Sequence, residues 1–245
     1  MRRKSLLNFF PAALCALAAL AVSAGGQGLE PAPTADAGQI VAKFISKETE
    51  FQRAFSRYAF RRDAVVQSIG MGGQVAGEFH RVSVISFDEQ GRQKERVLQM
   101  PIPSLAPSPT DLEDLNTIQL FVLEAAKLAQ YDFKLVGTEK IDEISTYVFD
   151  VAPKVMPDPK KSKDRYFQGR VWIDDEDFLL VKARGHGVPE GNERFPTFDY
   201  YREHDGRYWV PSLVTASDRL VMPSGRVVRL RIRVTYSDYE APPAK

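Results

Sequence analysis

The last predicted strand of this chain has one apolar face and one cationic face. Between residues 228 and 236 every second side chain is apolar, and the side chains between them are Arg229, Arg231, Arg233 and Thr235. Side chains on a β-strand alternate between the two faces of the sheet with a period of two. A sheet built of such strands keeps one face in water and must bury the other. The chain therefore has to supply, or bind, a cover for an apolar sheet face.

The first 24 residues have the features of a secretory signal peptide. Residues 1–4 are basic after the initial Met, residues 6–22 are rich in Ala and Leu, and Val22-Ser23-Ala24 fits a small-x-small cleavage site. This order of segments is typical of a signal that is removed after Ala24. An uncleaved N-terminal anchor is the alternative, but the apolar run is short for a membrane span.

The single cysteine, Cys15, lies inside this signal. Leu14 precedes it, whereas a lipidated cysteine needs a small residue there. We interpret Cys15 as part of the signal, so the exported chain has neither disulfides nor a thiol nucleophile. About 220 residues remain, enough for a substantial core without disulfides.

The charge balance argues against a nucleic-acid partner. The chain has 33 Lys and Arg against 32 Asp and Glu, and three of the basic residues lie in the signal. Nucleic-acid-binding domains are strongly basic as a rule. We therefore expect no nucleic-acid partner.

Two helices are predicted. Residues 25–35 form a Gly/Pro/Ala linker, after which Asp36 is expected to cap a helix to about Ser56, with Gln39 as its reciprocal partner. Its apolar stripe contains Ile40, Phe44, Phe51 and Phe55, and its water-facing side is predicted to hold Lys43, Lys47, Glu48 and Arg53. A second, more apolar helix is predicted over residues 111–130, with a capping box at residues 110–113.

Most of the remaining chain alternates as strands do, with short turns between the segments. The predicted strands cover residues 58–69, 74–87, 92–100, 131–138, 145–151, 165–173, 178–184, 197–203, 208–218 and 226–239. Such a run of strands with two inserted helices favours an α+β fold with an antiparallel sheet. A sheet of about ten twisted strands curls. We therefore predict a strongly curved half-barrel whose concave face is covered by the two main helices.

A predicted hairpin in the second half of the chain resembles a hairpin of a known protein family. Residues 169–174 read GRVWID, an acidic turn follows, and residues 178–184 read FLLVKAR. This resembles the Trp-containing strand, acidic turn and following strand of the LolA/LolB-like periplasmic lipoprotein carriers and outer-membrane lipoprotein-sorting proteins. The resemblance covers residues 36–239. Residues 36–240 are treated as one domain, with residues 241–245 as a disordered tail.

The resemblance implies an exported periplasmic protein with a cavity for acyl chains between sheet and helices. Shielding a lipid from water is favourable by about 25 cal/mol per Å² of apolar surface, so an apolar concave face suits this role. The candidate lipid-binding residues are Phe44, Phe51, Phe55, Val228, Leu230, Ile232 and Val234. The same periodicity also fits a packed core, because it reports burial and not a ligand.

No pattern in the sequence indicates catalysis or metal binding. The three histidines, His80, His186 and His204, match no zinc spacing, and the chain contains no G-x-S-x-G segment. Residues 174–177 are acidic but lack the spacing of a calcium loop. We expect no catalytic residue, no metal and no cofactor, and we do not expect an enzyme.

The sequence thus favours a periplasmic carrier of lipid or lipoprotein acyl chains that is a monomer. The alternative is an envelope sensor or scaffold of the same fold, with a self-filled core and a protein partner in the envelope or membrane. A secreted enzyme is a third hypothesis without a supporting motif. The role of Arg229, Arg231 and Arg233 stays open between contact with acidic headgroups and pairing with acidic residues on neighbouring strands.

Overall fold

The chain is described by a computed structural model. It places residues 29–31, 36–190, 196–206, 208–221, 225 and 227–241. The predicted signal peptide lies outside the described residues, as do most of the predicted linker and tail. Among the described residues, no helix is both long and apolar enough to cross a membrane.

The described strands form one open antiparallel sheet in the order β1-β5-β6-β7-β8-β9-β10-β11-β2-β3-β4. The pairing of β11 with β2 joins the last strand to the first long one, so the two halves of the chain share one sheet. The bounds are Glu30–Pro31, Ala59–Ile69, Val75–Phe87, Gln93–Gln99, Tyr131–Ile141, Ile144–Pro153, Tyr166–Asp174, Leu180–Val188, Phe198–His204, Trp209–Val221 and Val227–Glu240 for β1 to β11. The ten predicted strands and the α+β class are confirmed.

The additional strand, β1, comes from the predicted linker. Glu30 and Pro31 pair with Thr138 and Gly137 of β5. The two backbones are so close that a Cβ on Gly137 would lie 2.1 Å from the carbonyl oxygen of Glu30. A glycine is needed for this approach.

The first predicted helix is confirmed as α1, Ala37–Phe55. The side chain of Asp36 caps it by accepting a hydrogen bond from the amide of Gly38 at 2.9 Å. The buried side of α1 contains Ile40, Phe44, Phe51 and Phe55, as the periodicity predicts, but also Glu48.

The second predicted helix is wrong as a continuous element. Residues 111–130 fold as the end of α2 (Pro109–Glu113), the π-helical turn η1 (Asp114–Ile118), an irregular stretch and the 3-10 helix η2 (Ala125–Gln130). The capping box is formed by Ser108 and Asp111 rather than by residues 110–113.

The segment between η1 and η2 is deeply buried. Leu120, Val122 and Leu123 are each at most 1% exposed. The irregular backbone also frees the carbonyl of Leu120 for the Tyr200 hydroxyl and that of Leu123 for the Gln52 side-chain amide. Tertiary contacts therefore replace the helical hydrogen bonds.

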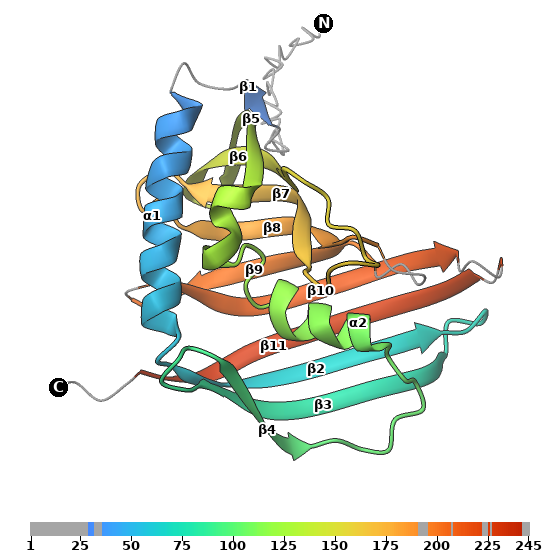
Figure 1. Cartoon of the computed structure of the whole chain (residues 1–245). Coiled ribbons are helices and arrows are strands. Elements are labelled where there is room, and N and C mark those ends of the chain that lie inside the picture. The colour runs from blue at the N-terminus through green and yellow to red at the C-terminus, as the bar shows by residue number, and fades with distance from the viewer. Residues whose placement is uncertain are drawn as a thin grey trace, which may run out of the picture.

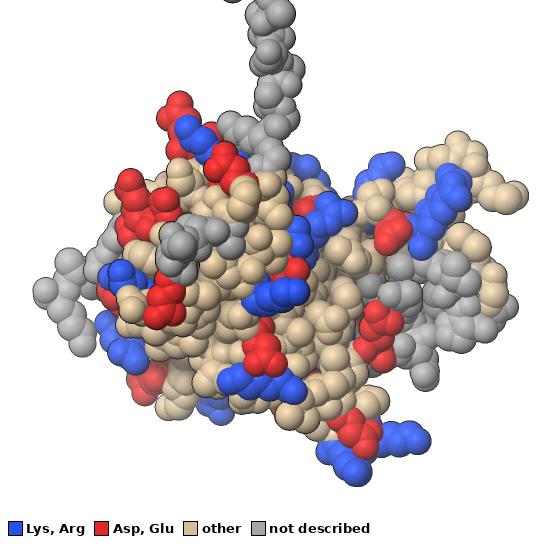
Figure 2. Space-filling view, turned by 90° about the horizontal axis from the view of Figure 1, so that it is seen from above, with Lys and Arg blue, Asp and Glu red and all other residues tan. Residues whose placement is uncertain are grey.

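Figure 1 shows α1, α2 and the segment between α2 and β5 on one side of the sheet, which bends around them. We call this side the covered face and the helical segments the cover. The main core lies between the two layers and unites α1 residues with side chains of β2, β3 and β5 to β11. Basic and acidic side chains are interspersed on the face shown in Figure 2, so neither charge dominates there.

A glycine pair in the centre of the sheet provides a test of this packing. Gly169 of β7 lies opposite Gly185 of β8. A Cβ on Gly169 would lie 2.2 Å from the Arg184 carbonyl oxygen and 2.8 Å from the Phe167 ring. We expect Gly169→Ala to lower the free energy of unfolding by about 1–3 kcal/mol, measured by urea titration, because the strands must move apart. Ser217→Ala, on the exposed part of β10, is the control and is expected to change it by less than about 0.5 kcal/mol. Equal stabilities would contradict the close approach.

Candidate functional site: the covered face of the sheet

The structure brings five of the seven predicted lipid-binding residues into one packed cluster. Phe44, Phe51, Phe55, Ile232 and Val234 are each at most 1% exposed and belong to the main core. Phe55 stacks on Phe51 at a centroid distance of 5.2 Å, and it also contacts Phe60 of β2 at 5.2 Å. Their side chains therefore fill the space beneath α1 in this structure. Whether they contact a lipid stays a prediction.

The other two predicted residues lie apart from this cluster. Val228 and Leu230 are half-buried near the start of β11, where it pairs with the last residues of β10. The alternation along β11 is confirmed, since Ile232 and Val234 are buried while Arg229, Arg231 and Arg233 are exposed. No ion pair joins these three arginines to another residue that the structure describes. Their register partners on β10 are Arg219, Ser217 and Thr215, so acidic neighbours do not explain them.

A buried ion pair links the cover to the sheet. Glu48 of α1 was expected to face water, but that expectation is wrong. Its carboxylate accepts hydrogen bonds from Nη2 of Arg202 at 2.6 Å and from Nη1 at 3.0 Å. Both side chains are fully buried. Burial alone would lower the pKa of Arg202, but the Glu48 carboxylate outweighs it and raises that pKa. The guanidinium also stacks 4.5 Å from the centroid of Phe51. Sequence reasoning missed this pair because its partners are 154 residues apart.

The pair extends into a hydrogen-bond chain that reaches the interrupted helix. Arg202 Nε donates to the hydroxyl of Tyr200 at 2.9 Å, and this hydroxyl donates to the carbonyl of Leu120 at 3.2 Å. Gln52 of α1 holds the residues that lead into η2. Its Nε2 donates to the carbonyl of Leu123 and its Oε1 accepts from the amide of Ala125, each at 2.6 Å. The irregular stretch between η1 and η2 is therefore held from both layers.

A second buried ion pair holds η1. Both carboxylate oxygens of Asp114 accept from Arg165, at 2.9 and 2.7 Å, and Asp114 is fully buried. Burial raises the pKa of Asp114, while the Arg165 guanidinium opposes that shift. A glycine is required at position 187, where a Cβ would lie 2.6 Å from the Asp114 carboxylate.

A third polar cluster lies on the covered face beside β4. Arg62 of β2 donates from Nη2 to Oε1 of Glu95 at 2.8 Å. The same carboxylate oxygen accepts from the Ser83 hydroxyl at 2.6 Å and lies 3.1 Å from Nε of Arg81. Asn116 of η1 accepts from Nη2 of Arg81 at 3.1 Å, so this cluster also connects the sheet to the cover.

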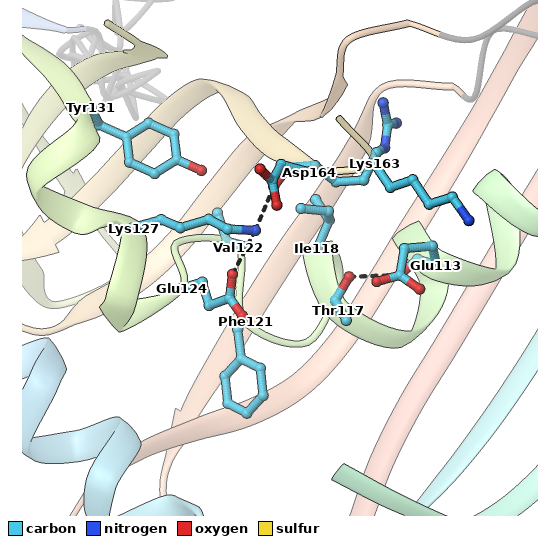
Figure 3. A pocket seen from close by; sticks show the side chains of 11 residues that line it. Glu113, Thr117, Ile118, Phe121, Val122, Glu124, Lys127, Tyr131, Lys163 and Asp164 are labelled. Atoms are coloured by element: carbon cyan, nitrogen blue, oxygen red, sulfur yellow. Dashed lines mark hydrogen bonds and ion pairs between the residues drawn. The ribbon is translucent and has the colours of Figure 1, made fainter. Parts of the chain in front are cut away.

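A small polar pocket lies between η1, η2 and the loop before β7 (Figure 3). Its volume is about 110 Å³, room for about four water molecules. Lys127 extends from η2 towards it and is held by Glu124 at 2.8 Å and by the carbonyl of Arg165 at 3.0 Å. Tyr131 also lines it, and burial raises the pKa of this phenol. The pocket is well below the 300–1,000 Å³ usual for a small-molecule site.

Two larger hollows are open to solvent. One, of about 530 Å³, adjoins the small pocket between α2 and the loop before β7. The other, of about 780 Å³, lies on the uncovered face of β5 to β8 and contains the ion pair of Asp150 with Arg170. Trp172 lines it and is covered by the ammonium of Lys182, 4.6 Å from the ring centroid. None of the seven predicted lipid-binding residues lines any of the three spaces.

The histidines do not form a metal centre among the described residues. His80 lies on the uncovered side of β3 and its Nε2 is 3.0 Å from the Asp63 carboxylate of β2. No group of three metal-ligating side chains occurs in the described part of the chain.

The buried pair of Glu48 and Arg202 yields a quantitative expectation. We expect Arg202→Met to lower the free energy of unfolding by about 3–5 kcal/mol, because it leaves a buried carboxylate without its partner. The double variant Glu48→Leu/Arg202→Met should recover part of this loss, which urea titrations of a double-mutant cycle measure. Glu50→Ala breaks the exposed pair with Lys47 and serves as the control, with an expected change below about 0.5 kcal/mol. Additive losses in the cycle would contradict the coupling.

Comparisons with known proteins leave the family open. No family model and no curated protein matches the sequence. Nineteen chains of solved structures match the fold in part. A DUF1329 family protein from Desulfovibrio piger ATCC 29098 aligns with a TM-score of 0.47 and 14% identity, over 84% of this chain and 94% of that one. MucB, solved in complex with MucA(peri), aligns with a TM-score of 0.25 and 12% identity, over 85% of this chain and 100% of that one. At these TM-scores neither likeness bears on function.

Proposed function

We propose that this chain is a non-enzymatic sensor or scaffold of the cell envelope, with an interior filled by its own side chains and a protein as its partner. The observation that carries the proposal is the packing of the covered face. Phe44, Phe51 and Phe55 occupy the space that a carrier would leave for an acyl chain. The 110 Å³ pocket between η1, η2 and the loop before β7 is far too small for one.

The attachment of the cover supports the same proposal. Lifting α1 would separate Glu48 from Arg202, and lifting η1 would separate Asp114 from Arg165. Each separation leaves a buried charge without its partner, which costs several kcal/mol. A ligand that enters beneath the cover has to offset these costs. The closed form is therefore the working form in this proposal.

The free edge of the sheet is the surface proposed for the partner. In the described part of the chain no strand pairs with the outer side of β4, which lies at the sheet's lower edge in Figure 1. Leu98 and Ile102 there are 45% and 98% exposed, and Val97 and Met100 are exposed as well. A free edge beside exposed apolar side chains favours pairing with another chain. Export to the periplasm follows from the predicted signal peptide and is part of the proposal.

An acyl-chain carrier is the second candidate. It is favoured by the continuous apolar covered face and by the division of the cover into short pieces, α2, η1 and η2, instead of one long helix. Short pieces can move separately. The open sheet with helical segments on one face is also what the resemblance to LolA/LolB-like carriers implies.

Native mass spectrometry of the protein purified from cell envelopes separates the two candidates. We expect the mass of the processed polypeptide without lipid, alone or together with a protein partner, because the core is filled. Addition of laurate should leave the melting temperature within about 1 °C, since a ligand that does not bind the native state does not stabilise it. A stoichiometric co-purifying lipid would contradict the scaffold and support the carrier.

The partner surface is testable by site-specific photocrosslinking in cells. A photoreactive residue at Leu98 or Ile102 is expected to give one adduct of defined mass, because both side chains are exposed beside the free edge. The same residue at Arg231, which is exposed on the uncovered face, is the control and should give none. Adducts at all three sites, or at Arg231 alone, would contradict a partner at β4.

A further inference from the structure

Arg62 has buried donor groups that nothing in the described structure satisfies. Its side chain is 1% exposed, and only Nη2 has a partner, Glu95. Its Nε and Nη1 are buried without a hydrogen-bond partner. Buried N–H groups of a charged side chain are costly when unpaired. Arg62 therefore marks a position where an acceptor is expected.

Tyr236 provides a second buried group at the same place. It is directly opposite Arg62 in the pairing of β11 with β2, and both side chains lie on the covered face. Directly opposite residues on one face have Cβ atoms about 5 Å apart. The Tyr236 hydroxyl is buried without a partner. Burial raises the pKa of this phenol, with the Arg62 charge opposing, so the hydroxyl keeps its proton and is a donor.

The charges of the cluster do not balance. Arg62 and Arg81 share one carboxylate, Glu95, which also accepts the Ser83 hydroxyl. Two guanidinium groups against one carboxylate leave one positive charge in a largely buried position. An unpaired buried cation is unfavourable, and an anion beside it would remove this cost.

We infer that Arg62 and Tyr236 form a binding site for an anionic oxygen group, a carboxylate or a phosphate, on the covered face between β2 and β11. One anionic oxygen group can accept from the guanidinium and from the phenol together, and charge-assisted hydrogen bonds of this kind are short and strong. Arg81 and Glu95 are 12% and 20% exposed, so solvent reaches the cluster from the side of β4. The inference goes beyond the proposed function and holds for a scaffold as well as for a carrier.

Two probes distinguish the sources of such a group. Inorganic phosphate represents a free anion, and laurate represents a carboxylate carried by an acyl chain. We expect calorimetric titration of the exported protein to show one equivalent of at least one probe. Binding of phosphate identifies a free-anion site and agrees with the scaffold, which is not expected to bind laurate. Binding of laurate alone identifies a headgroup site and supports the carrier instead of the scaffold.

Variants connect the binding to the two residues. We expect Tyr236→Phe to weaken binding about tenfold and Arg62→Met about a hundredfold, the usual range for a hydrogen bond to a charged group. Arg231→Met, on the opposite face of β11, is the matched control and should bind as the wild type does.

Stability of the ligand-free variants separates binding from folding. Without a ligand, Tyr236→Phe should be at least as stable as the wild type, because it removes a hydroxyl that has no partner. Weaker binding by this folded variant supports the site even if Arg62→Met does not fold. The inference is overturned if the wild type binds neither probe, or if Tyr236→Phe binds as tightly as the wild type.

Discussion

Burial of one face of an open sheet is the constraint on which the rest of this structure depends. Eleven antiparallel strands leave an apolar face that water would contact, and α1 with the shorter helical segments covers it. Hydrophobic packing brings the two layers together but fixes no register between them. The buried pair of Glu48 and Arg202 supplies that register, because its two hydrogen bonds form in only one position of α1.

The strands could be predicted because their information is local. Alternation of side chains is visible within a few residues, and it locates every long strand of the sheet, including the cationic and apolar faces of β11. The continuous helix over residues 111–130 was wrong for a physical reason. Leu120, Val122 and Leu123 are buried on all sides by elements from distant parts of the chain, and a periodic pattern does not contain those elements.

The polar part of the candidate site was even less accessible from sequence. Glu48 lies among charged residues on α1, and the sequence predicts that it faces solvent. In the structure it accepts a hydrogen bond from Arg202 of β9. Nothing in the sequence around Arg62 or Tyr236 indicates that the two side chains lie together. They become neighbours only because β11 pairs with β2. Five of the lipid-binding candidates, Phe44, Phe51, Phe55, Ile232 and Val234, lie in the core. Burial alone does not distinguish a cavity wall from core packing, so their contact with a lipid stays a prediction.

The two edges of the sheet differ, and this limits how copies of the chain can associate. At one edge, Glu30 and Pro31 of β1 pair with the backbone of Thr138 and Gly137 of β5. Pro31 has no amide hydrogen to donate to a further strand. Head-to-tail stacking needs two complementary free edges and would continue without limit. Because β1 covers Gly137 and Thr138 at one of them, growth into a fibre through that part of the edge is disfavoured, whereas antiparallel pairing of two β4 edges would give a closed, two-fold assembly.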